Sequence, residues 1–438
     1  MTPQSQNAFC LKLYDDGQPA FITPALIRTF EWLDALWVAA KQDPEQKHAR
    51  WKTVVNISYG QSAGLKDGTE LLEQHITRFS NDRFALGSPR PVIVMPVGNN
   101  NLEQSHIEMS VEKGAATKVS FRLQPQDYTP TQLEIWTTVQ EQPDWPFMAS
   151  LWAPGQHHEP NIPHAQPNQQ TAEIMANGKR CGQAFARRYT VETKGKVTYR
   201  FQYVFVLSPT HSWDPDNLSP SPSGEWTLIV QNTSEGELFF YGDIEVDQSL
   251  KSDSRLARSA YFTDLYKYPR FDPADRPFEM GDIRQESIDS KTLQVKQIGC
   301  HNSLANGKDV MIVAGHRSGD GLPAPYSSAM RSYASNGHGS RLPDASFPCD
   351  DAMASIGVLS AGIKSGSNSI RNGTSFSAAM ATRHIVQNLL VGRPPFNHAN
   401  IAESERKLVY YWQQISHCLL YTSPSPRDLS TSRMPSSA

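Results

Sequence analysis

Two short apolar runs with a helical pattern between them constrain the fold of this chain more than any other feature. The runs cover residues 51–58 and 91–97 and are rich in β-branched side chains. Such runs are typical of strands buried on both faces of a parallel sheet. Between them, one helix face is predicted by the apolar spacing of Leu71, Leu72, His75, Ile76 and Phe79. Because parallel strands are joined by crossovers of this kind, the pattern predicts an α/β layer.

The residues before this unit extend the same pattern. Residues 9–14 indicate a short strand. Apolar positions over residues 26–37 recur at helical spacing and predict a helix, with Thr23 as its N-cap and Pro24 as its first residue. A chain of 438 residues is long enough for two domains, or for one domain that carries a large insertion.

A different pattern fills residues 102–284. Apolar and polar residues alternate there in short runs, and loops rich in Pro, Gly, Asn and Asp separate the runs. The clearest runs are residues 119–123, 133–136, 199–205, 224–230 and 238–241. This alternation is typical of an antiparallel β-sandwich. We expect the aromatic side chains of these strands to belong to its core rather than to a sugar-binding platform.

The pattern of buried strands returns near the C-terminal end. Residues 310–315 predict another buried strand, and the run Asn-Gly-Thr-Ser-Phe-Ser-Ala-Ala at 372–379 opens a segment with helical periodicity. A hydroxyl at the start of a helix lies at the positive end of the helix dipole, which favours a nucleophile. Ser and Thr also cap many helices without any catalytic role, so the flanking sequence must decide between the two interpretations.

The run at 372–379 resembles the serine box of the subtilisin-like serine peptidases. This resemblance implies that Ser375 is the catalytic nucleophile and that Thr374 belongs to the substrate site. Ala379 stands where the family usually has Pro, and Met330 stands where a Gly is usual after a Tyr-Ser-Ser segment. The expected activity is therefore hydrolysis of peptide bonds in a peptide or protein substrate.

Two further stretches resemble the same family. Residues 54–60 are similar to the strand whose edge binds extended peptide, which implies substrate-binding roles for Ser58, Tyr59 and Gly60. Residues 94–99 are similar to the strand that ends in the oxyanion-binding Asn. This implies that Asn99 is a catalytic oxyanion donor and that Gly98 lines the substrate site. Alone, Gly-Asn would be interpreted as a turn.

The resemblance also implies a domain organisation. We expect an incomplete subtilisin-like parallel sheet with flanking helices, formed by residues 1–101 and 291–417. Residues 102–290 are then an inserted antiparallel β-sandwich or jelly-roll domain, an assignment that the weak jelly-roll motif at 224–230 supports. Residues 418–438 are similar to a translated sequencing adapter, and we expect them to be an artefact rather than part of the fold.

The chain departs from the family at the other two residues of the catalytic triad. Subtilisin-like peptidases use Asp, His and Ser in that order along the chain. Both the Asp and the His-Gly-Thr-His motif should precede residue 9, and neither is present there. His338 belongs to the one His-Gly pair in the sequence, and we interpret it as a loop residue. We therefore expect an N-terminally truncated fragment that is inactive, or nearly so, by itself.

Two alternatives stay open. The stretch Gly-Gln-Ser-Ala-Gly at 60–64 fits the nucleophile elbow of α/β-hydrolase esterases, with Ser62 as the nucleophile. However, a turn rather than a helix follows it. In the second alternative, the chain is an inactive subtilisin-like scaffold that binds a protein or glycan through its β-sandwich. The absent Asp and His favour that interpretation.

Composition and the remaining motifs limit which classes of partner and cofactor are expected. A net charge of −3 gives no reason to expect nucleic acid, and no apolar run approaches the ~20 residues of a membrane span. The five cysteines are scattered without metal-ligand spacing, and the N-terminus lacks a signal-peptide pattern. No cofactor or metal is expected from the residues, although calcium is frequent in the family. The family also implies an extracytoplasmic or secreted location, while the oligomeric state is left undetermined.

Overall fold

The computed structural model describes most of the chain between residues 22 and 392. The described residues are 22–44, 52–85, 90–156, 171–193, 195–211, 219–246, 257–263, 294–331, 333, 342–351, 357–362 and 364–392. The strand predicted at residues 9–14, the loop residue His338 and the segment 418–438 lie outside these ranges.

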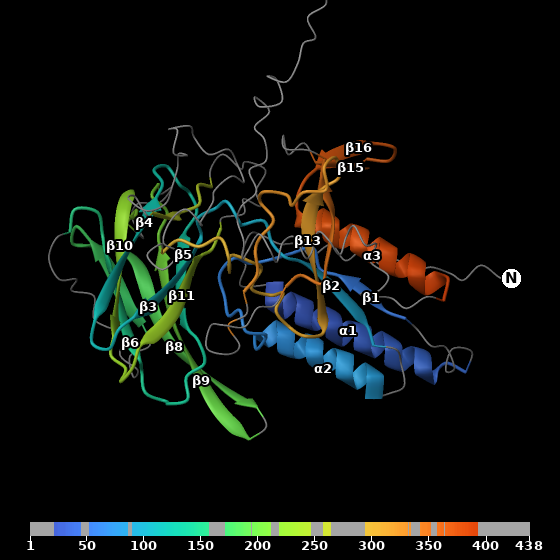
Figure 1. Cartoon of the computed structure of the whole chain (residues 1–438), viewed down its shortest axis with the longest axis horizontal. Coiled ribbons are helices and arrows are strands. Elements are labelled where there is room, and N and C mark those ends of the chain that lie inside the picture. The colour runs from blue at the N-terminus through green and yellow to red at the C-terminus, as the bar shows by residue number, and fades with distance from the viewer. Residues whose placement is uncertain are drawn as a thin grey trace, which may run out of the picture.

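A four-stranded parallel sheet forms one part of the molecule, drawn on the right of Figure 1. Its strand order is β1-β2-β13-β14, and every neighbouring pair is parallel. The strands are β1 (Val54–Asn56), β2 (Val92–Pro96), β13 (Val310–Arg317) and β14 (Ala345–Asp350). The short apolar runs are therefore strands of one parallel sheet, as predicted from their lack of alternation.

Helices cover both faces of this sheet (Figure 1). On one face, α1 (Ile22–Gln42) and α2 (Leu71–Ala85) share a hydrophobic cluster with the strand residues Ile93 and Ile312. On the other face, α3 (Thr374–Leu390) packs Ala378, Ala381 and Ile385 against Val94, Met311 and Val313. Neighbouring strand residues alternate between these two clusters because successive side chains of a strand point to opposite faces.

Two details of the helices differ from the sequence predictions. The first helix already includes Ile22, so Thr23 lies inside the helix rather than at its cap. In α2, Leu72, Ile76 and Phe79 are buried as predicted, but the side chain of Leu71 is 57% exposed. Leu71 is the first residue of that helix, where no preceding turn covers it.

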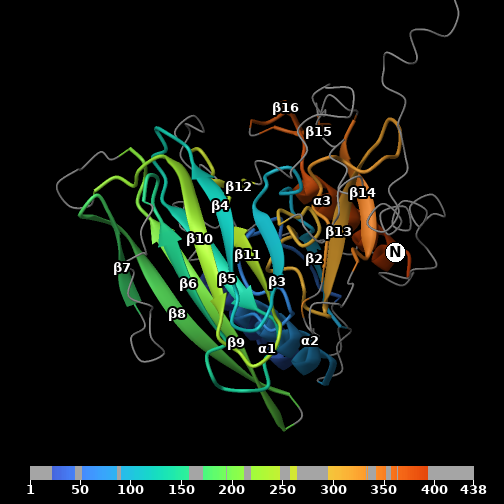
Figure 2. The same cartoon turned by 60° about the vertical axis from the view of Figure 1, so that its left-hand side comes forward.

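Antiparallel strands form the other part of the molecule (Figure 2). A four-stranded sheet has the order β12-β4-β10-β6, and a six-stranded sheet has the order β3-β11-β5-β9-β8-β7. Their strands are β3 (His106–Val111), β4 (Ala116–Leu123), β5 (Thr131–Thr137), β6 (Phe147–Trp152), β7 (Thr171–Ala176), β8 (Lys179–Thr193), β9 (Lys196–Leu207), β10 (Gly224–Asn232), β11 (Leu238–Ile244) and β12 (Tyr261–Thr263). All the described pairings within these two sheets are antiparallel.

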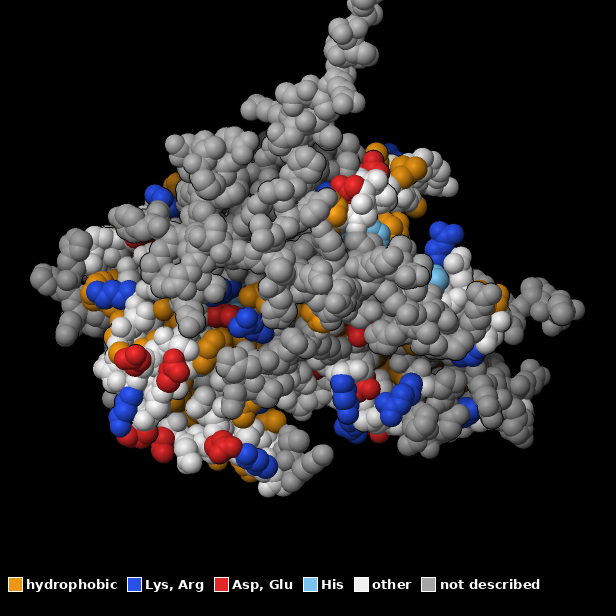
Figure 3. Space-filling model, in the orientation of Figure 1, with side chains coloured by type: hydrophobic (Ala, Val, Ile, Leu, Met, Phe, Trp, Pro, Cys, Tyr) orange, Lys and Arg blue, Asp and Glu red, His pale blue; other side chains and the backbone are white. Residues whose placement is uncertain are grey.

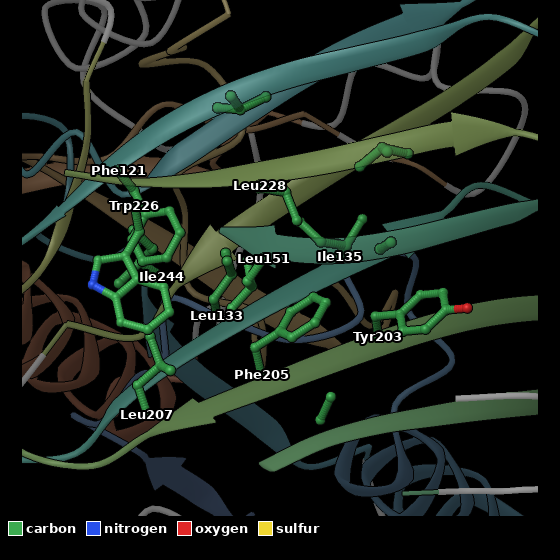
Figure 4. Packing of buried hydrophobic residues seen from close by; sticks show 14 of the residues in the cluster. Phe121, Leu133, Ile135, Leu151, Tyr203, Phe205, Leu207, Trp226, Leu228 and Ile244 are labelled. Atoms are coloured by element: carbon green, nitrogen blue, oxygen red, sulfur yellow. The ribbon is translucent and has the colours of Figure 1, made fainter. Parts of the chain in front are cut away.

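One hydrophobic core joins the two antiparallel sheets. Phe121 and Trp226 from the four-stranded sheet stack with their ring centroids 6.3 Å apart, and Phe205 from the six-stranded sheet belongs to the same cluster. Figure 4 shows these rings among aliphatic side chains from both sheets. The aromatic residues of this cluster are core residues, in agreement with the sequence prediction.

The chain enters and leaves the antiparallel strands at neighbouring positions. Ile107 in the first of these strands forms an antiparallel bridge with Val295, which precedes the return to the parallel sheet. The backbone N–H of Lys296 donates to the carbonyl oxygen of His106 over 3.0 Å. Adjacent ends are a common property of independently folded units. The domain boundaries themselves stay a prediction.

On β3, β11, β5 and β9, the outer face of the six-stranded sheet carries buried polar side chains and packs against the loop that follows β1. Lys66, in that loop, donates from Nζ to Asp243 Oδ1 at 2.6 Å, and both side chains are fully buried. Next to it, Asp67 accepts from Arg200 Nε at 2.7 Å. His106 Nδ1 lies 2.8 Å from the same oxygen of Asp243. Ion pairs therefore connect the loop of the parallel part to the antiparallel part.

Candidate active site

The start of α3 is held in place by the backbone that precedes it. Gly373 is the N-cap, with φ +124° and ψ 150°, and its backbone N–H donates to the hydroxyl oxygen of Tyr326 at 3.0 Å. A Cβ on this residue would lie 3.3 Å from Asn99 Nδ2. Only Gly adopts such a conformation readily, so the Gly of the motif serves a backbone purpose.

Asn99 and Thr374 lie in direct contact. Asn99 Oδ1 accepts hydrogen bonds from the backbone N–H and from the hydroxyl of Thr374, each at 2.9 Å. Thr374 is fully buried, whereas Asn99 is exposed. Because the oxygen of the Asn99 amide is engaged twice, its Nδ2 group is the end that is left to donate to a ligand. The structure thus brings together the two residues that the sequence assigned to the oxyanion and substrate sites.

Ser375 contacts the end of the first parallel strand. Its hydroxyl lies 3.5 Å from the carbonyl oxygen of Ser58, and the hydroxyl of Ser58 donates to the carbonyl oxygen of Ser375 at 3.2 Å. Asn56 Nδ2 donates to the Ser58 hydroxyl at 2.9 Å. Ser375 is half-buried in the first turn of α3, where backbone N–H groups have no intrahelical acceptor.

Tyr326 and Cys349 form a buried layer under this helix start. The Tyr326 hydroxyl lies 3.2 Å from Cys349 Sγ and 3.2 Å from Asp350 Oδ2. Burial, followed by the contact with Cys349, holds the pKa of Tyr326 well above its usual range. Burial also raises the pKa of the Cys349 thiol to about 11. Both groups are therefore neutral at physiological pH, and they support the helix start rather than titrate beside it.

Among the described residues, no imidazole or carboxylate is hydrogen-bonded to the Ser375 hydroxyl. His316 lies in the parallel sheet, but its Nδ1 is 2.9 Å from Ser346 Oγ. His316 lies four residues after Ile312 in β13, so both side chains point to the same face of the sheet. That face is covered by α1 and α2 rather than by α3. Burial lowers the pKa of His316, so it is held as a neutral ring. The described part of the site therefore holds the candidate nucleophile and the candidate oxyanion donor without a neighbouring base.

Asn302 is a neighbour of the site, and no sequence motif pointed to it. Its side chain is 1% exposed and lies between the ends of β1 and β2. Asn302 Nδ2 donates to the carbonyl oxygens of Tyr59 at 3.0 Å and Pro96 at 3.1 Å. A Cβ on Gly60 would lie 2.8 Å from Asn302 Cγ, so Gly60 makes room for this amide. Gly98 is packed similarly, because an added Cβ there would lie 3.1 Å from Ser328 Oγ.

Ser62 does not have the geometry of an esterase nucleophile. Its side chain is 2% exposed, and its hydroxyl donates to the carbonyl oxygen of Ile244 at 3.1 Å. The same hydroxyl accepts from the backbone N–H of Val246 at 2.8 Å. Residues 61–70 contain no helix, whereas an elbow Ser is followed directly by one. Ser62 instead attaches its loop to the end of β11.

Three features of the described residues concern other ligand classes: metal-binding clusters, surface charge and membrane-spanning helices. The described residues include no cluster of three or more His, Cys, Asp or Glu that could hold a metal ion. The expectation that the chain needs no cofactor stays untested. On the face drawn in Figure 3, Lys and Arg side chains lie beside Asp and Glu side chains along the lower edge. None of the described helices is both long and apolar enough to cross a bilayer. The expectation that nucleic acid is not a partner stays untested.

Comparisons with known proteins agree with the fold of this site. No protein-family model matches the chain, and no curated protein sequence matches it. Among solved structures, the chain is similar to the CspB protease of Clostridium perfringens, with a TM-score of 0.54 and 14% sequence identity. The alignment covers 86% of this chain and 62% of that protease, so this chain spans less than two thirds of its length. At this identity the similarity shows a protease-like fold alone.

Proposed function

We propose that this chain carries the nucleophile half of a subtilisin-like serine endopeptidase site. Ser375 is the nucleophile, Asn99 is the oxyanion donor, and Ser58, Tyr59 and Gly60 form the edge that holds an extended peptide. The protease-like fold of the structural neighbour supports a hydrolytic role in general. In this proposal, residues 102–290 form an inserted domain of the β-sandwich or jelly-roll type, and the substrate is a peptide or protein.

One observation carries the proposal. Residues from three separate stretches meet where the strands β1 and β2 end and α3 begins. Ser375 contacts Ser58, and Thr374 contacts Asn99, although the members of each pair lie 317 and 275 positions apart in the sequence. The carboxyl ends of parallel strands are where ligands bind in open α/β sheets. A chance serine motif would have no reason to meet a matching Asn there.

Each residue has a defined task in such a site. The Ser375 oxygen attacks the carbonyl carbon of the peptide bond, and negative charge develops on the former carbonyl oxygen. Asn99 Nδ2 donates to that oxygen, and a preorganised donor of this kind contributes roughly 3–4 kcal/mol to the transition state in comparable enzymes. The two hydrogen bonds from Thr374 fix the orientation of the Asn99 amide.

The proton of the Ser375 hydroxyl has to leave during the attack. In a subtilisin-like mechanism an imidazole accepts it, and an Asp orients that ring. We assign neither role to a described residue of this chain. Without its base, such a site keeps about 10³–10⁴-fold acceleration over water from its oxyanion hole and binding contacts. We therefore expect slow reactivity at Ser375, with solvent water accepting the proton of the hydroxyl.

A serine-directed fluorophosphonate tests the proposal on the chain itself. The folded protein is incubated with an alkyl fluorophosphonate, and the adduct is mapped by peptide mass spectrometry. We expect one adduct on Ser375 that the Ser375→Ala variant loses. The matched control is Ser360→Ala in β15 (Val358–Ala361), a strand that pairs with β16 (Asn368–Arg371) just before α3, and this variant should keep the adduct. An adduct on Ser62 would support an esterase instead. A folded protein without any adduct would favour a non-catalytic binding scaffold.

A further inference from the structure

The ends of β1 and β2 are connected by a single buried side chain. Regular pairing between these strands ends at Asn56 and Val94, and the backbone N–H of Ile57 adds one more bond to the Val94 carbonyl. Beyond this point, Asn302 Nδ2 donates to one carbonyl oxygen on each side, Tyr59 and Pro96. The Asn302 amide therefore links the two segments beyond the point where the backbone hydrogen bonds between β1 and β2 end.

The hydrogen-bonding capacity of this amide is fully used. Besides its two donor bonds, Asn302 Oδ1 accepts from the backbone N–H of Gln61 at 3.2 Å and of Leu304 at 3.1 Å. The backbone N–H of Asn302 donates to the Val97 carbonyl at 2.8 Å. An Asn side chain with two donors and two acceptors engaged has one fixed orientation. Buried and satisfied amides of this kind specify local geometry.

The two connected segments are those that carry the proposed site. Tyr59 lies in the edge assigned to peptide binding, and Val97 precedes Gly98 and Asn99, which form the oxyanion strand end. The distance between the peptide edge and the oxyanion donor decides where a bound carbonyl lies relative to Ser375. A shift of about 1 Å in such a site is enough to reduce rates by about a hundredfold.

We propose that Asn302 is a positioning residue, which holds the peptide-binding edge at Tyr59 in fixed register with the oxyanion donor Asn99. Asn302 acts through backbone carbonyls and does not touch the reacting atoms. The consequence for catalysis rests on the proposed peptidase function, whereas the connection between the two strand ends does not. Two independent readouts therefore separate the two statements.

The first readout is hydrogen exchange followed by mass spectrometry on the full chain. Asn302→Asp replaces two donors by a carboxylate facing the Tyr59 and Pro96 carbonyls, and Asn302→Ser shortens the side chain. We expect exchange at residues 57–63 and 94–99 to rise at least about tenfold in Asn302→Asp and less in Asn302→Ser. Exchange in the antiparallel sheets should stay unchanged. Unchanged exchange at both strand ends, or an equal rise throughout the chain, would overturn the proposal.

The second readout compares two probes that phosphonylate Ser375. A peptidyl diphenyl phosphonate needs the peptide edge, whereas a small alkyl fluorophosphonate needs only the nucleophile and the oxyanion donors. In Asn302→Asp, we expect the rate with the peptidyl probe to fall about tenfold more than the rate with the small probe. Equal losses for both probes would mean that Asn302 only stabilises the fold. If the unsubstituted protein reacts with neither probe, the peptidase proposal fails, and hydrogen exchange still decides the role of Asn302.

Asn232 provides the matched control for both readouts. It is also 1% exposed, and its Nδ2 donates to the carbonyl oxygens of Val111 and Gly236, each at 2.8 Å. Its Oδ1 accepts from the backbone N–H and the hydroxyl of Ser234. Because Asn232 ends a strand of the antiparallel part, Asn232→Asp should raise exchange locally there. It should leave the ratio of the two labelling rates unchanged.

Discussion

Asn99 Oδ1 accepts two hydrogen bonds from Thr374, one from the backbone N–H and one from the hydroxyl, each at 2.9 Å. This pair connects the end of β2 to the first residue of α3. Since the oxygen of the Asn99 amide is thereby fixed, the direction in which its Nδ2 group can donate is fixed as well. The catalytic quality of the proposed site depends on this contact.

The Thr374 hydroxyl can be removed with little change of shape. Thr374→Val loses one neutral hydrogen bond, which contributes about 0.5–1.5 kcal/mol, so labelling of Ser375 by a fluorophosphonate should slow about threefold to tenfold. Asn99→Ala removes the donor itself and should slow labelling by about 10²–10³. Thr382→Val, which removes a hydroxyl bonded within the same helix, is the control. Equal rates in all three variants would contradict the assigned orientation.

Gly373 should tolerate no side chain. Gly373→Ala forces a Cβ into a backbone conformation reserved for Gly, at a cost of about 1–3 kcal/mol, and places it 3.3 Å from Asn99 Nδ2. We expect a lower melting temperature and at least about tenfold slower labelling of Ser375. Gly366→Ala is the control, because its φ is also positive while nothing lies within 4 Å of the added Cβ. A similar loss of labelling in both variants would argue against a contact with Asn99.

The buried ion pair between Lys66 and Asp243 should be costly to break from one side. Lys66→Met leaves the Asp243 carboxylate buried without its ammonium partner, which destabilises proteins by about 3–5 kcal/mol. Urea unfolding followed by tryptophan fluorescence measures this loss. Lys196→Met removes an exposed pair with Glu141 and should leave the unfolding midpoint unchanged. If both variants shift the midpoint equally, the buried pair has no special role.

The carboxyl group of Glu73 should make stability depend on pH. Burial raises its pKa from about 4.5 to about 8, because the charged form is disfavoured inside the protein. The folded-state pKa lies above the unfolded value, so the contribution is fully present below about pH 4.5 and is lost as the pH rises to about 8. The loss amounts to roughly 1.4 kcal/mol per pH unit for one such group.

Replacing this carboxyl group isolates its effect. Glu73→Gln cannot ionise, so the fall in unfolding free energy between about pH 5 and 8 should be shallower than in the unsubstituted protein. Urea midpoints at about half-unit steps of pH measure the slope. The control is Glu141→Gln, whose exposed carboxyl has a pKa lowered by Lys196. Parallel pH profiles for Glu73→Gln and the unsubstituted protein would contradict a raised pKa.

The order of the elements and the meeting of the site residues could be predicted from the sequence. Both predictions rest on local signals: apolar runs for the buried strands, motifs at two strand ends for Ser58 and Asn99, and a motif at a helix start for Ser375. A motif at the end of a buried strand predicts where its residues lie, because the carboxyl ends of parallel strands share one edge of the sheet. The similarity in fold to a solved protease agrees with that prediction in its coarse form.

Residues whose partners are distant main-chain atoms could not be predicted. Asn302 donates to the carbonyl oxygens of Tyr59 and Pro96. Every residue has a backbone carbonyl, so the sequence does not indicate which ones a distant side chain will bind. In the sequence, Lys66 and Asp243 are indistinguishable from exposed charged residues. Their burial as an ion pair depends on how the antiparallel sheet packs against the loop after β1. Ser62 fits the spacing of an esterase motif. Only the structure shows that its buried hydroxyl is hydrogen-bonded to backbone groups at the end of β11.

The place of the antiparallel strands in the chain has a consequence for the order of folding. Asn302 and Pro96 lie 206 positions apart, and β2 and β13 pair as neighbours across the same stretch. Contacts between such distant segments form slowly, because a long loop must close before they contribute. The bridge between Ile107 and Val295 brings the two flanks together once the antiparallel sheets exist. We therefore expect refolding to proceed through a species with native antiparallel sheets and an unfinished parallel sheet.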